Sequence, residues 1–164
     1  MTGHVIHLDR QIYATPQQVW GVLTDVGHSA ETIRSVNNVE VLNEVQGFGV
    51  GMRWREDRKL MGHNGTEELE VIESEAPSHF AVQTTRDKDV VRMTYTLTPL
   101  DDGTRLSLTL VDDMTKRNPL SQLAWNLWGE VNLHSTRRML VHDLDDVAHA
   151  AEALAMKSPD STSG

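Results

Sequence analysis

The residues best suited to chemistry in this sequence are Glu56 and Arg58, a carboxylate and a guanidinium that follow Met52 and Trp54 at two-residue spacing. Side chains of a β-strand point alternately to its two faces, so residues two apart share a face. One face of the strand predicted here would carry Met52, Trp54, Glu56, Arg58 and Leu60. The other would carry Arg53, Arg55, Asp57 and Lys59, which are all charged and suit solvent. We therefore predict that Glu56 and Arg58 point inward.

Neighbouring elements supply further polar candidates for the same interior. Glu67 would share this face from the next strand and Tyr95 from a later one, while the last helix would bring His134 near its apolar stripe. Because an unpaired buried charge is costly, an inward Glu56 or Glu67 needs Arg58, Arg138 or a histidine nearby. The predicted ligand-binding residues are Trp54, Glu56, Arg58, Glu67, Met93, Tyr95, Leu108, Val131, His134 and Arg138.

Two interpretations of these polar residues stay open. A few polar groups inside an apolar pocket can orient a ligand oxygen or transfer a proton. Alternatively, Glu56 and Arg58 form a structural ion pair, or a bulge turns them to the rim. Tyr95 suits a pocket wall better than an acid, and His134 suits a partly exposed helix position. No catalytic residue is assigned.

Several kinds of site are excluded by the sequence. The chain has no cysteine, hence no thiol nucleophile, disulfide or thiolate metal site. It has no nucleophile-elbow, Walker or dinucleotide-binding motif, and the glycine-rich stretch 47–51 joins two predicted strands instead of opening a helix. His63 stands alone in a predicted turn. We therefore expect neither a metal nor a cofactor.

Composition narrows the class of protein. The chain has 164 residues, 38% of them hydrophobic and 24% charged, which suits one globular domain. Its formal net charge of -9 argues against nucleic acid and anionic membranes as partners. No apolar run approaches the roughly 18 residues of a membrane span, and no signal sequence is evident. A soluble cytoplasmic protein is expected.

The order of the predicted elements is that of an α+β fold. Strands are predicted near 5–13, 37–46, 50–60, 66–75, 79–86, 90–99 and 104–112, separated mostly by short turns. Such short connections favour antiparallel pairing. Thr15 followed by Pro16 and Gln18 predicts the start of a helix with a capping box, and 27–34 is expected to form a second short helix.

The last predicted element is a long helix that begins at Asn118-Pro119. Its apolar stripe first follows Leu120, Leu123, Ala124, Leu127 and Val131, then moves round to Leu140, Leu144, Val147, Ala151 and Leu154. A helix this long exceeds the sheet, so we expect a kink, an overhang or a partner contact, for example in a homodimer. The domain would span residues 1–155, followed by a disordered tail at 156–164.

Several stretches resemble one known superfamily. The segments 13–20, 49–58 and 65–71, together with Asp102-Gly103-Thr104-Arg105-Leu106, are similar to sequences of the START-like superfamily, also called Bet v 1-like or SRPBCC. The branch of polyketide cyclases/dehydrases and lipid transport proteins is the most similar, over about Val5 to Leu144. The resemblance implies a helix-grip fold, in which a seven-stranded curved antiparallel sheet surrounds a long C-terminal helix with a cavity between them.

Fold alone does not choose among the functions of such relatives. Our leading expectation is a protein that binds a lipid-like or polycyclic, polyketide-type molecule in this cavity. One alternative is a polyketide cyclase or dehydratase that uses polar cavity residues for proton transfer. Another is an interaction module resembling chaperone activators, which would need an exposed apolar patch. Whether the protein is an enzyme stays open.

Overall fold

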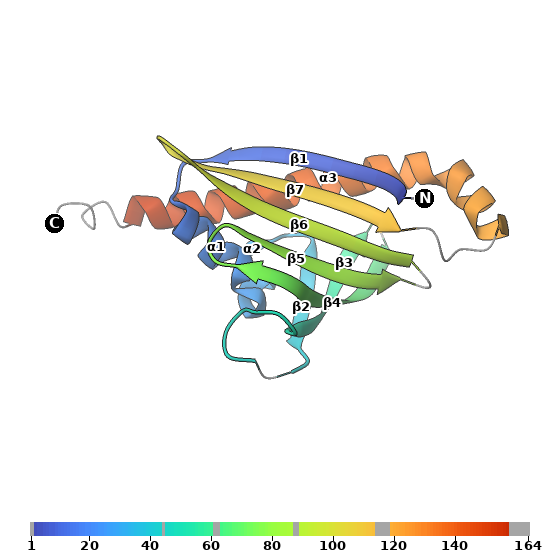
Figure 1. Cartoon of the computed structure of the whole chain (residues 1–164), viewed down its shortest axis with the longest axis horizontal. Helices are drawn as coiled ribbons and strands as arrows, with labels where there is room; N and C mark the ends of the chain where they lie inside the picture. Colours follow the sequence, from blue (N-terminus) through green and yellow to red (C-terminus); the bar gives the residue numbers. More distant parts are fainter. Residues whose placement is uncertain (1, 44, 61–62, 87–88, 114–118, 158–164) are drawn as a thin grey trace.

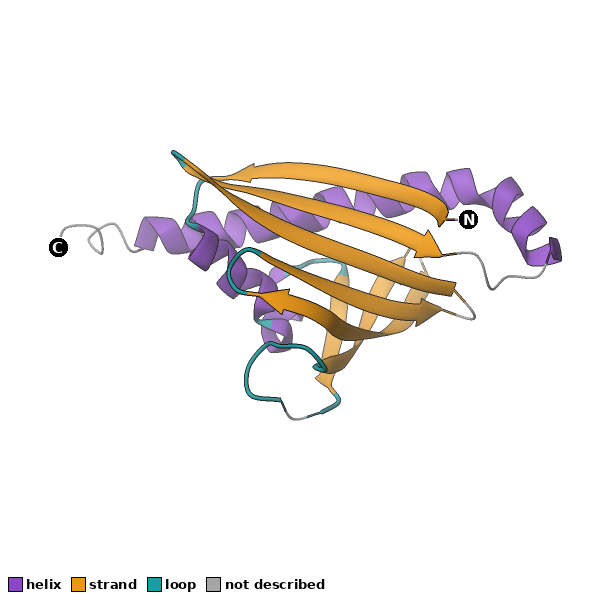
Figure 2. Cartoon of the chain, viewed as in Figure 1, coloured by secondary structure: helices purple, strands orange, loops and turns teal. Residues whose placement is uncertain are grey.

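The computed structural model describes residues 2–43, 45–60, 63–86, 89–113 and 119–157, with side chains for 5–43, 45–58, 65–84, 90–112 and 134–157. Figures 1 and 2 show a curved sheet with one long helix lying along it and short helices at one end. The elements are β1 (Thr2–Ile12), α1 (Pro16–Thr24), the 3-10 helix η1 (Val26–His28), α2 (Ser29–Thr32), β2 (Val36–Val41), β3 (Arg53–Leu60), β4 (His63–Glu75), β5 (His79–Arg86), β6 (Asp89–Leu100), β7 (Gly103–Asp113) and α3 (Pro119–Lys157).

The seven strands form one antiparallel sheet in the order β1-β7-β6-β5-β4-β3-β2. Every strand from β2 to β7 pairs with its neighbour in sequence, as short connections favour. The crossing from β1 to β2 is made by the short helices, which places β1 and β2 at opposite edges. The α+β architecture predicted from the sequence is confirmed, and the second short helix expected over 27–34 is observed as η1 followed directly by α2.

The loop between β2 and β3 differs from the sequence prediction. A strand was expected over 37–46 and the next from residue 50, but β2 ends at Val41 and β3 begins at Arg53. The side chain of Asn43 crosses this loop, donating to the carbonyl of Gly51 at 2.7 Å and accepting from the backbone N–H of Arg53 at 2.8 Å. An asparagine amide thus takes the place of ladder hydrogen bonds and ends the strand pair.

Helix α1 begins as its sequence predicts. The side chain of Thr15 accepts from the backbone N–H of Gln18 at 3.2 Å, and Gln18 Oε1 accepts from the Thr15 backbone N–H at 3.0 Å. This reciprocal pair is a complete capping box with Pro16 in the first turn. It fixes the helix that carries Val19 into the core.

Thr15→Ala is expected to lower the free energy of unfolding by about 1 kcal/mol, because an N-cap acceptor is lost. Urea denaturation measures this as a lower midpoint with an unchanged slope. The conservative variant Thr15→Ser keeps the acceptor and should retain most of the stability. Equal midpoints for the alanine variant and wild type would contradict the importance of the capping box.

The core lies between the sheet and the C-terminal part of α3. Leu140, Leu144, Val147 and Ala151 are buried at helical spacing, as predicted, whereas Leu154 is 43% exposed and lies beyond the buried stripe. The earlier stripe residues, Leu120 to Val131, have side chains outside the described set. The helix is a single element without a break, and Figure 1 shows its first turns reaching beyond the ends of β1 and β7. An overhang is therefore observed, but at the first turns, which also bend away from the line of the rest of the helix (Figures 1 and 2), and not after Leu140, where a kink, an overhang or a partner contact was expected.

Candidate functional site

Three residues of β3 form a hydrogen-bonded row on the inner face of the sheet. Trp54 and Glu56 are buried at 6% and 4% exposure, and the Arg58 side chain is only 12% exposed. The Trp54 indole Nε1 donates to Glu56 Oε2 at 3.2 Å, and Arg58 Nε donates to Glu56 Oε1 at 2.5 Å. The prediction that Glu56 and Arg58 point inward is confirmed.

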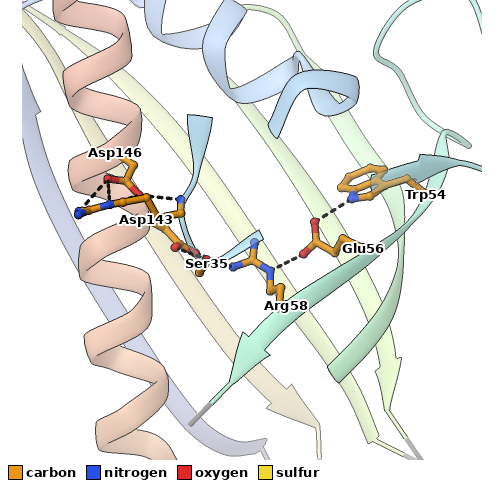
Figure 3. Close-up of polar contacts among 7 residues, drawn as sticks. Ser35, Trp54, Glu56, Arg58, Asp143 and Asp146 are labelled. Atoms are coloured by element: carbon orange, nitrogen blue, oxygen red, sulfur yellow. Dashed lines mark hydrogen bonds and ion pairs between the residues drawn. The ribbon is translucent and has the colours of Figure 1, made fainter. Parts of the chain in front are cut away.

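Ser35 and Asp143, which lie outside β3, bind to this row. We call the five residues together the Arg58 cluster: Trp54, Glu56, Arg58, Ser35 and Asp143. Arg58 Nη1 donates to Asp143 Oδ2 at 2.6 Å and to Ser35 Oγ at 3.0 Å, and Ser35 Oγ donates to Asp143 Oδ1 at 2.6 Å. Figure 3 shows the chain of contacts running from β3 to α3, with Ser35 just before β2. The cluster therefore ties the sheet to the C-terminal helix.

A second acidic residue anchors α3 beside this cluster. Asp146 is buried and accepts from the backbone N–H of Arg34 at 3.0 Å and from the Arg34 side-chain Nε at 3.1 Å. The Arg34 side chain itself is 77% exposed. This outer pair orients the helix, while Asp143 presents its carboxylate to the interior.

Burial and neighbouring charges have opposite effects on the pKa values of Arg58 and Asp143. Burial alone would lower the pKa of Arg58, but the carboxylates of Glu56 and Asp143 outweigh it and the pKa is raised. Arg58 is therefore a permanent cation here. Burial raises the pKa of Asp143, although Arg58 and the hydrogen bond from Ser35 partly offset it. Two carboxyl groups therefore face one guanidinium in this cluster.

Tyr95 lies on the same inner face within an aromatic group of Trp20, Phe48, Phe80 and Tyr95. Its ring stacks on Phe80 with centroids 4.7 Å apart, and Phe80 meets Phe48 edge-on at 4.9 Å. Burial raises the pKa of the Tyr95 hydroxyl, although Arg58 acts on it in the opposite sense. The phenol therefore stays protonated and can donate a hydrogen bond. Within the described part of the chain, no residue accepts from or donates to this hydroxyl.

The other predicted ligand-binding residues on strands lie on the inner face of the sheet, as their alternation in the sequence predicted. Met93 and Leu108 are buried in the core, and Leu108 pairs directly with Tyr95 across β6 and β7. Glu67 is partly buried opposite Glu56 in the β3–β4 ladder and has an interaction of its own.

Two helix candidates do not join the cluster. His134 and Arg138 are both exposed, and the side chain of Val131 lies outside the described set. At about 100° per residue, Arg138 is about 160° around the helix from buried Leu140, and His134 about 120°. The stripe that faces the sheet is set by Leu140, Leu144 and Val147, so Arg138 cannot pair with Glu56.

Sequence reasoning missed Asp143 and Ser35. A signal for Asp143 was present, because it lies three residues after Leu140 and beside Leu144, within the buried stripe. An acidic residue in such a stripe needs a partner, and Arg58 was the inward cation available. Ser35 gave no comparable signal, since it lies in a short connection between α2 and β2.

The described residues include no group of three or more potential metal ligands. Nor does any helix among them combine the length and the apolar character that crossing a membrane requires. The chemistry that the described side chains can offer at this site is hydrogen bonding by Arg58 and Tyr95 and proton exchange by Asp143.

Comparison with solved structures shows where this fold recurs. The protein TTHA0849 of Thermus thermophilus is 20% identical, with a TM-score of 0.76 over 93% of this chain and 99% of that one. The Zhui aromatase/cyclase of Streptomyces sp. R1128 is 21% identical, with a TM-score of 0.70 over 91% and 94%. A START superfamily protein from Mycobacterium smegmatis is 14% identical, with a TM-score of 0.64 over 94% and 99%. These identities support a shared helix-grip fold alone.

The sequence itself matches one protein family. No curated protein matches the sequence of this chain. The match to the family described as polyketide cyclase/dehydrase and lipid transport covers residues 4–144, most of the chain and nearly all of the sheet. The residues of the Arg58 cluster, from Ser35 to Asp143, fall inside this range. The chain therefore belongs to the polyketide cyclase/dehydrase and lipid transport family.

Proposed function

We propose that the protein binds a hydrophobic small molecule, lipid-like or polycyclic, between the inner face of the sheet and α3. The observation that carries this proposal is the Arg58 cluster, a charged group buried where hydrophobic side chains of the sheet and helix meet. Small-molecule sites typically combine apolar walls with a few polar groups that fix the ligand's orientation. Trp54, Met93 and Leu108 would supply such walls.

Unused hydrogen-bond capacity distinguishes this cluster from a purely structural ion pair. Arg58 uses Nε and Nη1, but Nη2 donates to no residue in the described ranges. The Tyr95 hydroxyl is likewise unused there, and Arg58 is close enough to act on it electrostatically. Two donors with spare hydrogen-bonding capacity on the inner face of the sheet favour a ligand with an accepting oxygen.

The proposal predicts saturable binding of a neutral polycyclic probe with a carbonyl oxygen. Nile red should bind with about one equivalent and micromolar affinity, as measured by fluorescence titration. Tyr95→Phe should weaken binding about fivefold to tenfold, the usual effect of one lost hydrogen bond.

The chain's other tyrosine provides the control. Tyr13 is 60% exposed, so Tyr13→Phe makes the same atomic change away from the proposed site and should leave the affinity unchanged. Saturable binding that ignores both substitutions would place the ligand elsewhere. Binding without saturation would reject a defined site.

A second candidate function is a cyclase or dehydratase reaction on a polyketide-type chain. It is favoured by one observation, a carboxyl with a raised pKa at Asp143 held against a permanent cation at Arg58. A carboxyl held in this way can exchange a proton with a ligand oxygen. A cyclised product formed from a linear poly-β-carbonyl chain would distinguish catalysis from binding alone.

A further inference from the structure

The Arg58 cluster places two carboxyl groups against one guanidinium. Glu56 lies on one side of the guanidinium at 2.5 Å and Asp143 on the other at 2.6 Å. All three side chains are largely shielded from solvent, with exposed fractions of 12% for Arg58, 5% for Glu56 and 10% for Asp143. Screening by water is weak in such surroundings, so the count of charges matters more here than at the surface. The guanidinium is already neutralised.

The groups left over are hydrogen-bond donors. The Tyr95 phenol and Arg58 Nη2 have O–H and N–H groups that no residue in the described part of the chain accepts. Both can donate to a neutral oxygen. A ligand carboxylate would also accept from them, but it would be the third carboxylate around one guanidinium and would meet net repulsion.

From this balance we infer the chemical class of the ligand, an inference that rests on the proposed function. The ligand is a neutral hydrophobic molecule with an accepting oxygen, such as a carbonyl, and the surplus carboxylate of the Glu56–Arg58–Asp143 cluster discriminates against anions such as fatty acids. The hydrophobic walls can pack against the apolar part of either class, and the cluster adds a discrimination by charge.

A matched pair of probes tests this inference: 1-pyrenebutyric acid and its methyl ester, which share ring, chain and carbonyl but differ in charge. A carboxylate is better hydrated than an ester, so a preference for the ester alone is not diagnostic. The diagnostic quantity is how the affinity ratio of ester to acid changes when the cluster loses one negative charge.

Asp143→Asn removes that charge with little change of shape. The asparagine amide can accept from Arg58 with its oxygen and donate to Ser35 Oγ with its nitrogen, so the contacts of Asp143 can be retained. Asp145→Asn is the matched control, because it removes one charge from the same helix at a residue that pairs with Arg10 outside the cluster. Glu56→Gln removes the equivalent charge from the other side of Arg58.

Asp143→Asn is expected to lower the ester-to-acid affinity ratio by about tenfold or more, with Glu56→Gln moving it in the same direction. Asp145→Asn should change it less than twofold. The inference is overturned if the ratio is the same in wild type and both cluster variants, or if Asp145→Asn changes it as much as Asp143→Asn. In either case Nile red binding that depends on Tyr95 would still support the proposed function. If neither Nile red nor the pyrene probes bind wild type, the proposed function fails as well.

Discussion

Arg58→Met is expected to lower the free energy of unfolding by about 3–5 kcal/mol, the usual cost of removing one partner from a buried ion pair. Methionine fills much of the space of the arginine side chain, so the loss comes mainly from charge. Glu56 and Asp143 would remain buried without their cation, and among the described residues Trp54 alone would still donate a hydrogen bond to Glu56. Urea denaturation with a constant slope measures the change.

A variant with several replacements separates the cost of losing the ion pair from the cost of burying charge. Glu56→Gln with Arg58→Met and Asp143→Asn leaves no charge in the cluster, and the cost should fall well below that of Arg58→Met alone. Strong coupling in a double-mutant cycle of Glu56→Gln and Arg58→Met would show that the two groups communicate directly. If the uncharged triple variant folds and still binds Nile red, the charges serve stability; if it folds and binding is lost, they orient the ligand.

The neighbouring arginine on β3 is the control for this experiment. Arg55 lies on the other face, is 44% exposed and pairs with Glu68 at 2.7 Å and Glu40 at 3.4 Å. Exposed ion pairs contribute about 1 kcal/mol or less, so Arg55→Met should have a small effect. A loss below about 0.5 kcal/mol for Arg58→Met as well would show that the inward cluster does not behave as a buried network.

The inner face of β3 could be predicted because alternation is a local property of the sequence. Residues 52 to 55 alternate between apolar and charged, and only one register buries Met52 and Trp54 while exposing Arg53 and Arg55. The inward direction of Glu56 and Arg58 follows from that register. The capping box at Thr15 is equally local, since it depends on residues three apart.

The residues that pair with Glu56 and Arg58 could not be predicted from local sequence in the same way, because their identity depends on how α3 is rotated against the sheet. The apolar stripe of a long helix shifts around the helix axis along its length. Whether His134 and Arg138 or instead Asp143 can reach Glu56 and Arg58 depends on which turn of the helix lies over β3. The sheet selects the turns of Leu140 to Ala151, which exposes Arg138 and buries Asp143. The prediction for the loop before β3 was wrong for a similar reason, since the Asn43 side chain competes with the ladder.

The second large effect is expected at the turn between β6 and β7, where Gly103→Ala should cost about 3 kcal/mol or more. A Cβ at position 103 would lie 2.1 Å from the backbone oxygen of Ile12, the last residue of β1. The φ of Gly103 is 157°, which side-chain-bearing residues rarely adopt. Ile12 is fully buried, and neither backbone can move without shifting the β1–β7 ladder.

This contact matters for the site because the end of β1 leads directly into α1. The next residue, Thr104, donates its buried hydroxyl to the carbonyl of Ala14 at 2.7 Å, just before the cap of that helix. Helix α1 carries Trp20, which meets Phe80 at 5.5 Å in the aromatic group beside Tyr95. A displaced β1 should therefore weaken Nile red binding as well as stability.

Glycine to alanine at another position supplies a control, for which the expected change in stability has the opposite sign. Gly21 lies inside α1, and a Cβ there would meet no atom within 4 Å. Alanine favours a helix interior over glycine by up to about 1 kcal/mol, so Gly21→Ala should raise the urea midpoint while Gly103→Ala lowers it strongly. A Gly103→Ala protein as stable as wild type would contradict the close approach of β7 to the end of β1. A large loss from both variants would instead point to a general sensitivity of this end of the sheet, not to the backbone contact at Ile12.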